Sequence, residues 1–145
     1  MAAGRLIGLD HGIKRIGIAI SDVTRTLARE VTILTRKSRI EDFAAINALA
    51  AKEEATGYVI GMPYSLDAPE GVHTQADTVK LWIERFRETT DLPIVEWDEQ
   101  FTSDDARDIA RQNKRKYDAP IDDLAARVML QSFLNALRDD LATFP

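Results

Sequence analysis

The feature that most constrains this chain is a pair of short apolar runs, 6–9 and 16–20, joined by a tight polar connection. Two such runs separated by a few turn-forming residues predict a β-hairpin. In the second run the three isoleucines alternate with Gly17 and Ala19. This is the period of a strand, and it gives the strand one face of large residues and one face of small residues.

The first strand is expected to end at Asp10, and Gly12 follows two residues later. A carboxylate at a strand end beside a glycine suits catalysis, because the rigid strand aims the acid and the glycine lets a ligand approach the backbone. The simpler alternative is a plain hairpin turn, since Asp and Gly are both common turn residues. A chemical role for Asp10 therefore depends on partners from the rest of the chain.

The chain has 145 residues and no cysteine. This length suits a single domain, 1–145, with a core large enough to be stable unaided. Without cysteine there can be no disulfide, thiolate metal site or cysteine nucleophile, and a reducing compartment is compatible. Neither a signal peptide nor an apolar run long enough to span a membrane is evident. We expect a cytoplasmic protein that makes no membrane contact.

The formal net charge is −5, which argues against general nucleic-acid binding. The charge is unevenly distributed, however, since residues 107–116 contain five cations and one anion. An acidic protein with one basic segment can still bind a polyanion locally, particularly if its acids bind metal cations.

Beyond the hairpin, the periodicity predicts an alternation of strands and helices. Strands are expected at 27–34, 58–61 and 92–97, and helices at 38–55, 72–87, 102–112 and 118–141. Ser38 and Glu41 form a capping-box pattern at the start of the first helix, and Gly57 is expected to end it. Three strands followed by two β-α units imply an α/β fold, with a five-stranded mixed sheet and helices on both faces.

Three acids stand at the ends of these elements: Asp10, Glu99 and Asp122. Ligands collect where the carboxyl ends of parallel strands share one edge, and we expect these acids to meet there. Carboxylates without histidine or cysteine favour Mg²⁺ or Mn²⁺. Two such ions about 4 Å apart can support phosphodiester hydrolysis through an activated water. The alternatives are that Asp122 is an ordinary first-turn helix acid and that Glu99 is a solvated loop residue.

Several further residues could take part in the site or have a simpler structural role. The candidates for phosphate contact are cations: Lys14, Arg15, Arg111, Lys114, Arg115 and Lys116. Each of them could instead simply be solvated. His11 could bind metal or phosphate, although a loop histidine beside an aspartate more commonly faces solvent. Trp82 and Trp97 fall in apolar patterns that favour core packing.

Four segments together resemble one known family, and they cover nearly the whole chain. They are residues 10–22 (DHGIKRIGIAISD), 59–67 (VIGMPYSLD), 98–103 (DEQFTS) and 121–126 (IDDLAA). In order and spacing they are similar to the motifs of the YqgF family, also called RuvX.

The resemblance implies an RNase H-like fold related to the RuvC resolvases, with metal-dependent nuclease activity. It assigns the catalytic, metal-binding acids to Asp10, Glu99 and Asp122. Family members are linked to 5′-end processing of pre-16S rRNA, and Holliday-junction resolution has also been proposed for them. The expected partner is therefore a nucleic acid, pre-rRNA or branched DNA.

Two rival functions remain open. One is a nucleic-acid-binding assembly factor that no longer cleaves, for which Gln100 is the sequence hint, since the family usually has arginine there. The other is a phosphate-binding relative of the sugar-kinase and actin group, which would need far more chain for its second domain. The protein could be a monomer or a homodimer, and symmetric cutting of a junction would favour a dimer.

Overall fold

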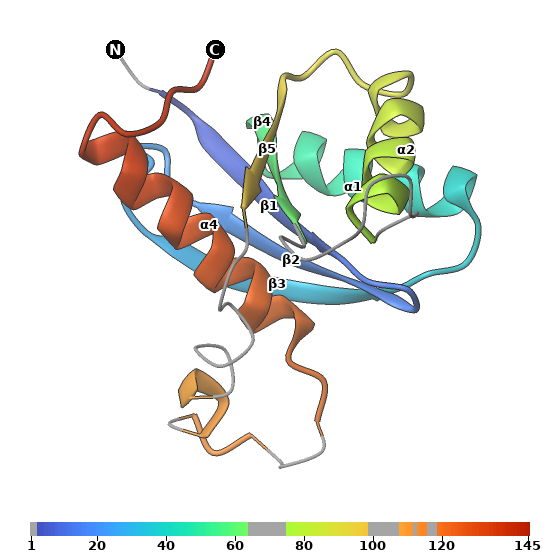
Figure 1. The fold of residues 1–145 in the computed structure, drawn as a ribbon, viewed down its shortest axis with the longest axis horizontal. Helices are drawn as coiled ribbons and strands as arrows, with labels where there is room; N and C mark the ends of the chain where they lie inside the picture. Colours follow the sequence, from blue (N-terminus) through green and yellow to red (C-terminus); the bar gives the residue numbers. More distant parts are fainter. Residues whose placement is uncertain (1–2, 64–74, 99–107, 112, 116–118) are drawn as a thin grey trace, which may run out of the picture.

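A five-stranded mixed sheet forms the centre of the molecule (Figure 1). The computed structural model describes residues 3–63, 75–98, 108–111, 113–115 and 119–145. The strands are β1 (Arg5–His11), β2 (Arg15–Ser21), β3 (Ala28–Thr35), β4 (Ala55–Met62) and β5 (Ile94–Asp98). The helices are α1 (Arg39–Lys52), α2 (Gln75–Arg87) and α4 (Asp122–Arg138). Of the helix expected at 102–112, residues 108–111 are helical and the remainder lies outside the described residues.

The strands run in the spatial order β3-β2-β1-β4-β5. β2 pairs antiparallel with both β1 and β3, whereas β4 pairs parallel with β1 and with β5. The predicted meander followed by two parallel strands is therefore confirmed. Because β1, β4 and β5 run the same way, their carboxyl ends share one edge of the sheet.

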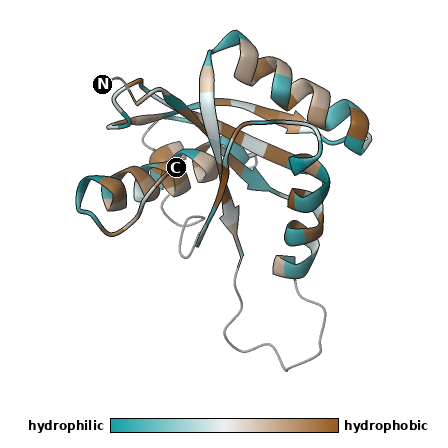
Figure 2. Ribbon diagram, turned by 90° about the horizontal axis from the view of Figure 1, so that it is seen from above, coloured by the Kyte–Doolittle hydropathy of each residue, from teal (hydrophilic) through white to brown (hydrophobic). Residues whose placement is uncertain are grey.

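The two faces of the sheet carry different helices, with α4 on one side and α1 and α2 on the other (Figure 1). The isoleucines of β2 are buried in the core beneath α1 and α2, while Ala19 packs in the core beneath α4. Hydrophobic and hydrophilic residues alternate around the helices in Figure 2, as expected for helices that bury one side. The small-residue face of β2 is thus the surface on which α4 rests.

Helix α1 begins as predicted but ends differently. Its N-cap is Ser38, whose side chain accepts a hydrogen bond of 3.2 Å from the Glu41 amide. The helix stops at Lys52, and Glu54 adopts a left-handed φ of 55°. The prediction that Gly57 ends the helix is wrong, because Gly57 lies inside β4. A Cβ there would come within 2.2 Å of the Phe144 ring, so the glycine makes room for that ring.

In the described part of the chain, no helix is both long enough and apolar enough to cross a membrane.

Candidate active site at the carboxyl edge of the sheet

Asp10 lies near the end of β1, directly opposite Gly17 of β2 in the antiparallel register. Residues directly opposite in such a pair project from the same face of the sheet. A Cβ built on Gly17 would point at α4, so Asp10 also lies on the α4 face. Gly8, two residues earlier on β1, likewise lies beneath Leu130 of α4.

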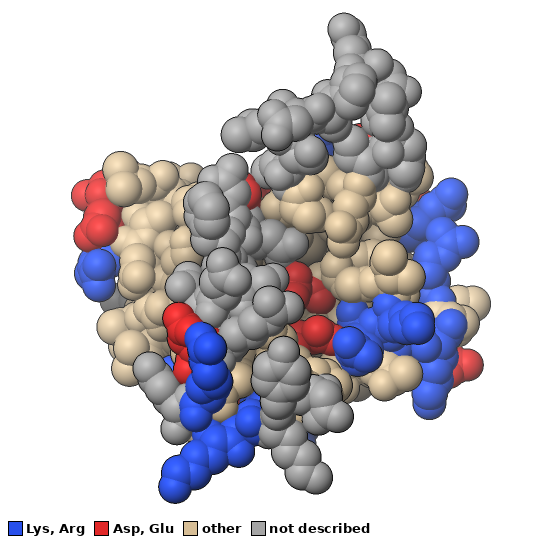
Figure 3. Space-filling model, turned by 60° about the horizontal axis from the view of Figure 1, so that its bottom comes forward, with Lys and Arg blue, Asp and Glu red and all other residues tan. Residues whose placement is uncertain are grey.

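Asp122 reaches the same place from the first turn of α4. Its carbonyl oxygen lies 1.8 Å from the ideal Cβ position on Gly17, so only glycine allows this approach. Since Gly17 is the register partner of Asp10, the contact brings the backbone of Asp122 over the strand next to Asp10. In Figure 3, where the lower side of Figure 1 comes forward, acidic side chains lie near the middle with basic side chains to their right.

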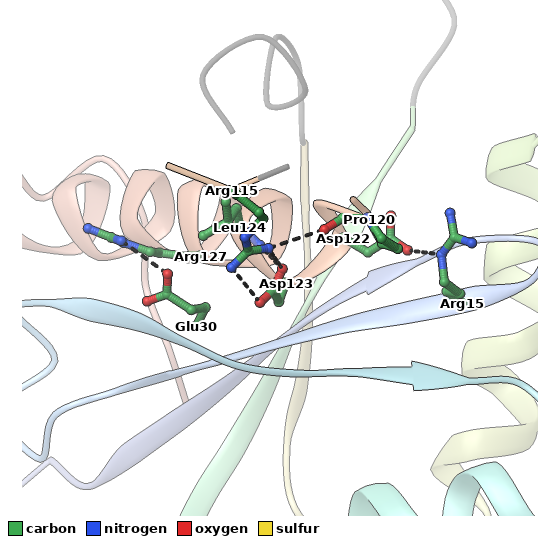
Figure 4. Close-up of polar contacts among 8 residues, drawn as sticks. All are labelled: Arg15, Glu30, Arg115, Pro120, Asp122, Asp123, Leu124 and Arg127. Atoms are coloured by element: carbon green, nitrogen blue, oxygen red, sulfur yellow. Dashed lines mark hydrogen bonds and ion pairs between the residues drawn. The ribbon is translucent and has the colours of Figure 1, made fainter. Parts of the chain in front are cut away.

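Arg15 binds the carboxylate of Asp122. Its Nε atom donates to Asp122 Oδ2 over 2.6 Å, and the two side chains remain 44% and 26% exposed (Figure 4). Arg15 is two residues from Gly17 on β2, so strand alternation directs it toward the same face. A charge-assisted bond of this length fixes the acid while leaving it open to solvent.

Arg115 makes the second ion pair of the region, with Asp123. Its Nη1 and Nη2 atoms lie 2.7 and 3.3 Å from the two carboxylate oxygens, and Nη1 also donates to the Pro120 carbonyl (Figure 4). Asp123 is 8% exposed and also accepts from the Leu124 amide. The hydrogen bond to Asp123 raises the pKa of the Arg115 guanidinium. Arg115 therefore holds residues 119–121 against α4, and a phosphate contact would require it to leave Asp123.

The remaining predicted phosphate contacts differ in their surroundings. Lys14 and Lys114 are exposed. Arg111 is exposed too, and it forms an ion pair with Asp108. Lys116 lies outside the described residues.

Asp10 and Asp122 are the two expected acids that the structure brings together. Glu99 lies outside the described residues, directly after Asp98, the last residue of β5. Within the described ranges no three acidic or histidine side chains are grouped closely enough to hold a metal ion. The two carboxylates nevertheless fit a hard cation, since Asp122 is partly exposed and both acids lie at the edge where the parallel strands end.

His11 is buried at the end of β1, so the expectation that it faces solvent is wrong. It follows Asp10 in the strand, and alternation turns it to the opposite face, where its ring centroid lies 4.9 Å from that of Trp82. Burial, reinforced by the charge of Arg36, lowers its pKa from 6.5 to about 4. Among the described residues, neither His11 Nε2 nor Trp82 Nε1 has a hydrogen-bond partner. Its position gives His11 a role in the core.

Sequence reasoning missed the pairing of Arg115 with Asp123 and the seat that Gly17 provides for Asp122. The small-residue face of β2 was the available signal for the second feature. Nothing in the sequence pattern distinguished Arg115 from its basic neighbours.

This sheet order, with helices on both faces and acids at the carboxyl edge, defines an RNase H-like fold of the RuvC type. Two solved structures share it. RuvC of T. thermophilus, in complex with a Holliday junction substrate, matches with a TM-score of 0.64 at 10% identity, over 96% of this chain and 98% of that chain. The fowlpox virus resolvase, in complex with substrate Holliday junction DNA, matches with a TM-score of 0.52 at 14% identity, over 92% and 98%.

The chain belongs to the RuvX family, whose sequence model is described as Holliday junction resolvase and matches residues 4–136. A relative from Caldanaerobacter subterraneus subsp. tengcongensis is 37% identical over 142 residues, which cover 93% of this chain and 99% of the relative. One from Rhodopseudomonas palustris (strain BisA53) is 38% identical over 140 residues, covering 92% and 83%. Both carry the name "Putative pre-16S rRNA nuclease". The predicted family and RNase H-like fold are confirmed, and the expected enzyme class, a nuclease, is supported.

Proposed function

We propose that this protein is a divalent-metal-dependent nuclease that hydrolyses phosphodiester bonds during 5′-end processing of pre-16S rRNA in the cytoplasm. The observation that carries the proposal is the contact of Asp122 with Gly17, which brings a helix-borne acid beside the strand-borne Asp10. The RNA substrate is inferred from the names of the relatives.

Asp10, Glu99 and Asp122 would hold Mg²⁺ or Mn²⁺, because carboxylate oxygens are the ligands these hard cations prefer. When bound, the metal ions supply activation of a water molecule and stabilisation of the leaving oxygen. Arg15 orients the Asp122 carboxylate and offsets part of the repulsion between neighbouring acids. Its exposed fraction also leaves the guanidinium accessible to a substrate phosphate.

The cations that follow Asp10 or precede Asp122 in the chain are proposed to position the nucleic-acid backbone rather than to select its sequence. They are Lys14, Arg15, Arg111, Lys114 and Lys116. Arg115 contributes indirectly, because its pair with Asp123 holds the basic segment close to the start of α4.

A cleavage panel tests this function. It compares single-stranded RNA, a pre-rRNA leader and four-way DNA junctions, each with Mg²⁺ and with Mn²⁺. Asp10→Asn, Glu99→Gln and Asp122→Asn should each abolish cleavage while leaving the thermal unfolding midpoint nearly unchanged. The matched control is Asp139→Asn, which removes an exposed carboxylate at the far end of α4 and should cleave normally. Unchanged cleavage by Asp10→Asn would reject the assignment.

Holliday-junction resolution is a second candidate, favoured by the description of the family model. Symmetric nicking of two strands would require two active sites, and so a homodimer rather than a monomer. Paired nicks in the four-way junction, together with a dimer mass in solution, would support this candidate over rRNA processing. Binding without cleavage under either metal would instead favour a non-cleaving assembly factor.

A further inference from the structure

The turn between β1 and β2 carries an apolar side chain that neither the core nor the proposed active site uses. Ile13, at the tip, is 84% exposed, whereas Ile16 and Ile20 in the following strand are fully buried. Single exposed apolar residues are common on protein surfaces and need no explanation by themselves. What distinguishes Ile13 is how its turn is held and what surrounds it.

The turn is fixed to the body of the protein by Arg36. The Arg36 Nη1 atom donates to the carbonyl oxygens of Gly12 and Ile13 over 3.0 and 3.3 Å, and the Arg36 amide donates to Lys14 O over 2.9 Å. Its Nε atom lies 3.8 Å from the carboxylate of Asp42, whose side chain is 3% exposed. Several hydrogen bonds and a buried counter-ion therefore hold the backbone of the turn that carries Ile13 in one position.

Four basic residues lie in the turn or on the segment bonded to it. Lys14 and Arg15 follow Ile13 in the chain, and Lys37 and Arg39 lie on the segment that Arg36 ties to the turn; all four are exposed. The patch of Lys and Arg in Figure 3 lies on the side toward which the β1–β2 hairpin extends in Figure 1. In a chain whose net charge is −5, this local excess of cations complements a phosphate backbone.

The tip is also close to the proposed catalytic acids. Ile13 is three residues from Asp10, and an extended chain advances about 3.3 Å per residue, so the two are separated by at most about 10 Å. A nucleic-acid strand advances about 3.4 Å per nucleotide in a B-form duplex. A strand whose phosphate reaches Asp10 and that runs toward the tip would therefore reach Ile13 within about three nucleotides.

We propose that Ile13 is a wedge that packs against an unstacked base, close to the bond being cut, in a bulged, looped or branched nucleic acid. Proteins that bend or open nucleic acids insert aliphatic side chains between bases in this way, with neighbouring cations on the phosphates. The cost of unstacking is smallest where a base is already unpaired, so the wedge selects irregular sites over regular duplex. This inference rests on the proposed nuclease function, since it needs the substrate at Asp10 and Asp122.

The test uses Asp10→Asn protein, so that binding is measured without cleavage, and compares it with Asp10→Asn/Ile13→Ser. The probes are a bulged RNA hairpin and a four-way DNA junction, each with 2-aminopurine within three nucleotides of the expected cut, plus fully paired duplexes of equal length. The matched control, Leu141→Ser, replaces another aliphatic residue, 78% exposed and just beyond the far end of α4. Ile13→Phe keeps an apolar tip and should preserve the wedge.

We expect Ile13→Ser to weaken binding to the bulged or branched probe about tenfold and to abolish the 2-aminopurine signal, with less than about twofold change on paired duplexes. If Ile13→Ser changes binding and 2-aminopurine fluorescence for the RNA probe alone or the DNA probe alone, that probe identifies the kind of nucleic acid that the wedge takes. Equal affinity and equal fluorescence for Ile13→Ser and its parent would overturn the wedge, as would an absence of binding to every probe. The wild-type cleavage panel is scored separately, so a cleaving enzyme unaffected by Ile13→Ser refutes the wedge alone.

Discussion

The carbonyl oxygen of Asp122 occupies the space that a side chain on Gly17 would fill, 1.8 Å from the ideal Cβ position. Gly17 is also the residue of β2 that stands opposite Asp10. One glycine thus determines how closely the first turn of α4 approaches β1, and with it the spacing of the two acids.

Gly17→Ala should therefore lower nuclease activity by about a hundredfold or more, because a displacement of about 1 Å in a catalytic group can have that effect. The added methyl group meets backbone atoms of Asp122 and Asp123, which cannot rotate away. The measurement is the cleavage rate per folded molecule under saturating Mg²⁺ or Mn²⁺.

Gly8→Ala is the control for that prediction. A Cβ at Gly8 comes within 2.9 Å of Leu130 Cβ, so this variant also strains the packing of α4 on the sheet, but about two turns beyond Asp122. It should lose stability while keeping its cleavage rate per folded molecule. Equal losses of activity in both variants would mean that general packing, rather than the position of Asp122, explains the effect.

Arg15→Gln should weaken nucleic-acid binding with little effect on folding. The pair with Asp122 is partly exposed, and such pairs contribute about 0–1 kcal/mol to stability. Loss of one phosphate-contacting cation should reduce the slope of log K against log salt by about 1. Fluorescence anisotropy across a salt series measures this slope. An unchanged slope would show that Arg15 binds only Asp122 and makes no contact with a substrate phosphate.

Arg115→Ala should destabilise the protein, in contrast to Arg15→Gln. It leaves the carboxylate of Asp123, which is 8% exposed, without its bidentate partner. Breaking a fully buried pair costs about 3–5 kcal/mol, and the partial exposure of Arg115 reduces the expected cost to about 1–3 kcal/mol. Urea unfolding measures the change. Lys114→Ala, which alters an exposed neighbour, should leave the midpoint in place.

These cases show what the sequence pattern could reveal. The succession of strands and helices along the chain followed from the spacing of apolar runs. The close approach of α4 to Gly17 was missed, although the alternation of Gly17 and Ala19 with large residues was a signal for it. The partner of Arg115 was not predictable, because the basic run looks uniform until the fold brings Asp123 beside one member. The end of α1 was misjudged because Glu54, a residue with a side chain, adopts the left-handed conformation expected of glycine.

His11 was misjudged for a related reason. The first strand was expected to end at Asp10, which would leave His11 in a loop, but β1 continues through His11. One additional strand residue reverses the direction of the side chain and moves it from solvent into the core.

That burial predicts how stability depends on pH. The pKa of His11 is about 4 in the folded protein and near 6.5 when unfolded, so between these values the unfolded chain binds more protons. The contribution of neutral, buried His11 to the free energy of unfolding is complete above pH 6.5. It is lost as the pH falls toward 4, which lowers that free energy by at most about 3 kcal/mol. His11→Phe removes the titrating group and the unpartnered Nε2 while keeping a ring against Trp82. Urea unfolding of both proteins from pH 7 to pH 4 should show a steeper decline for the wild type, since the carboxylates titrate in both. Parallel curves would show that His11 is not the group responsible.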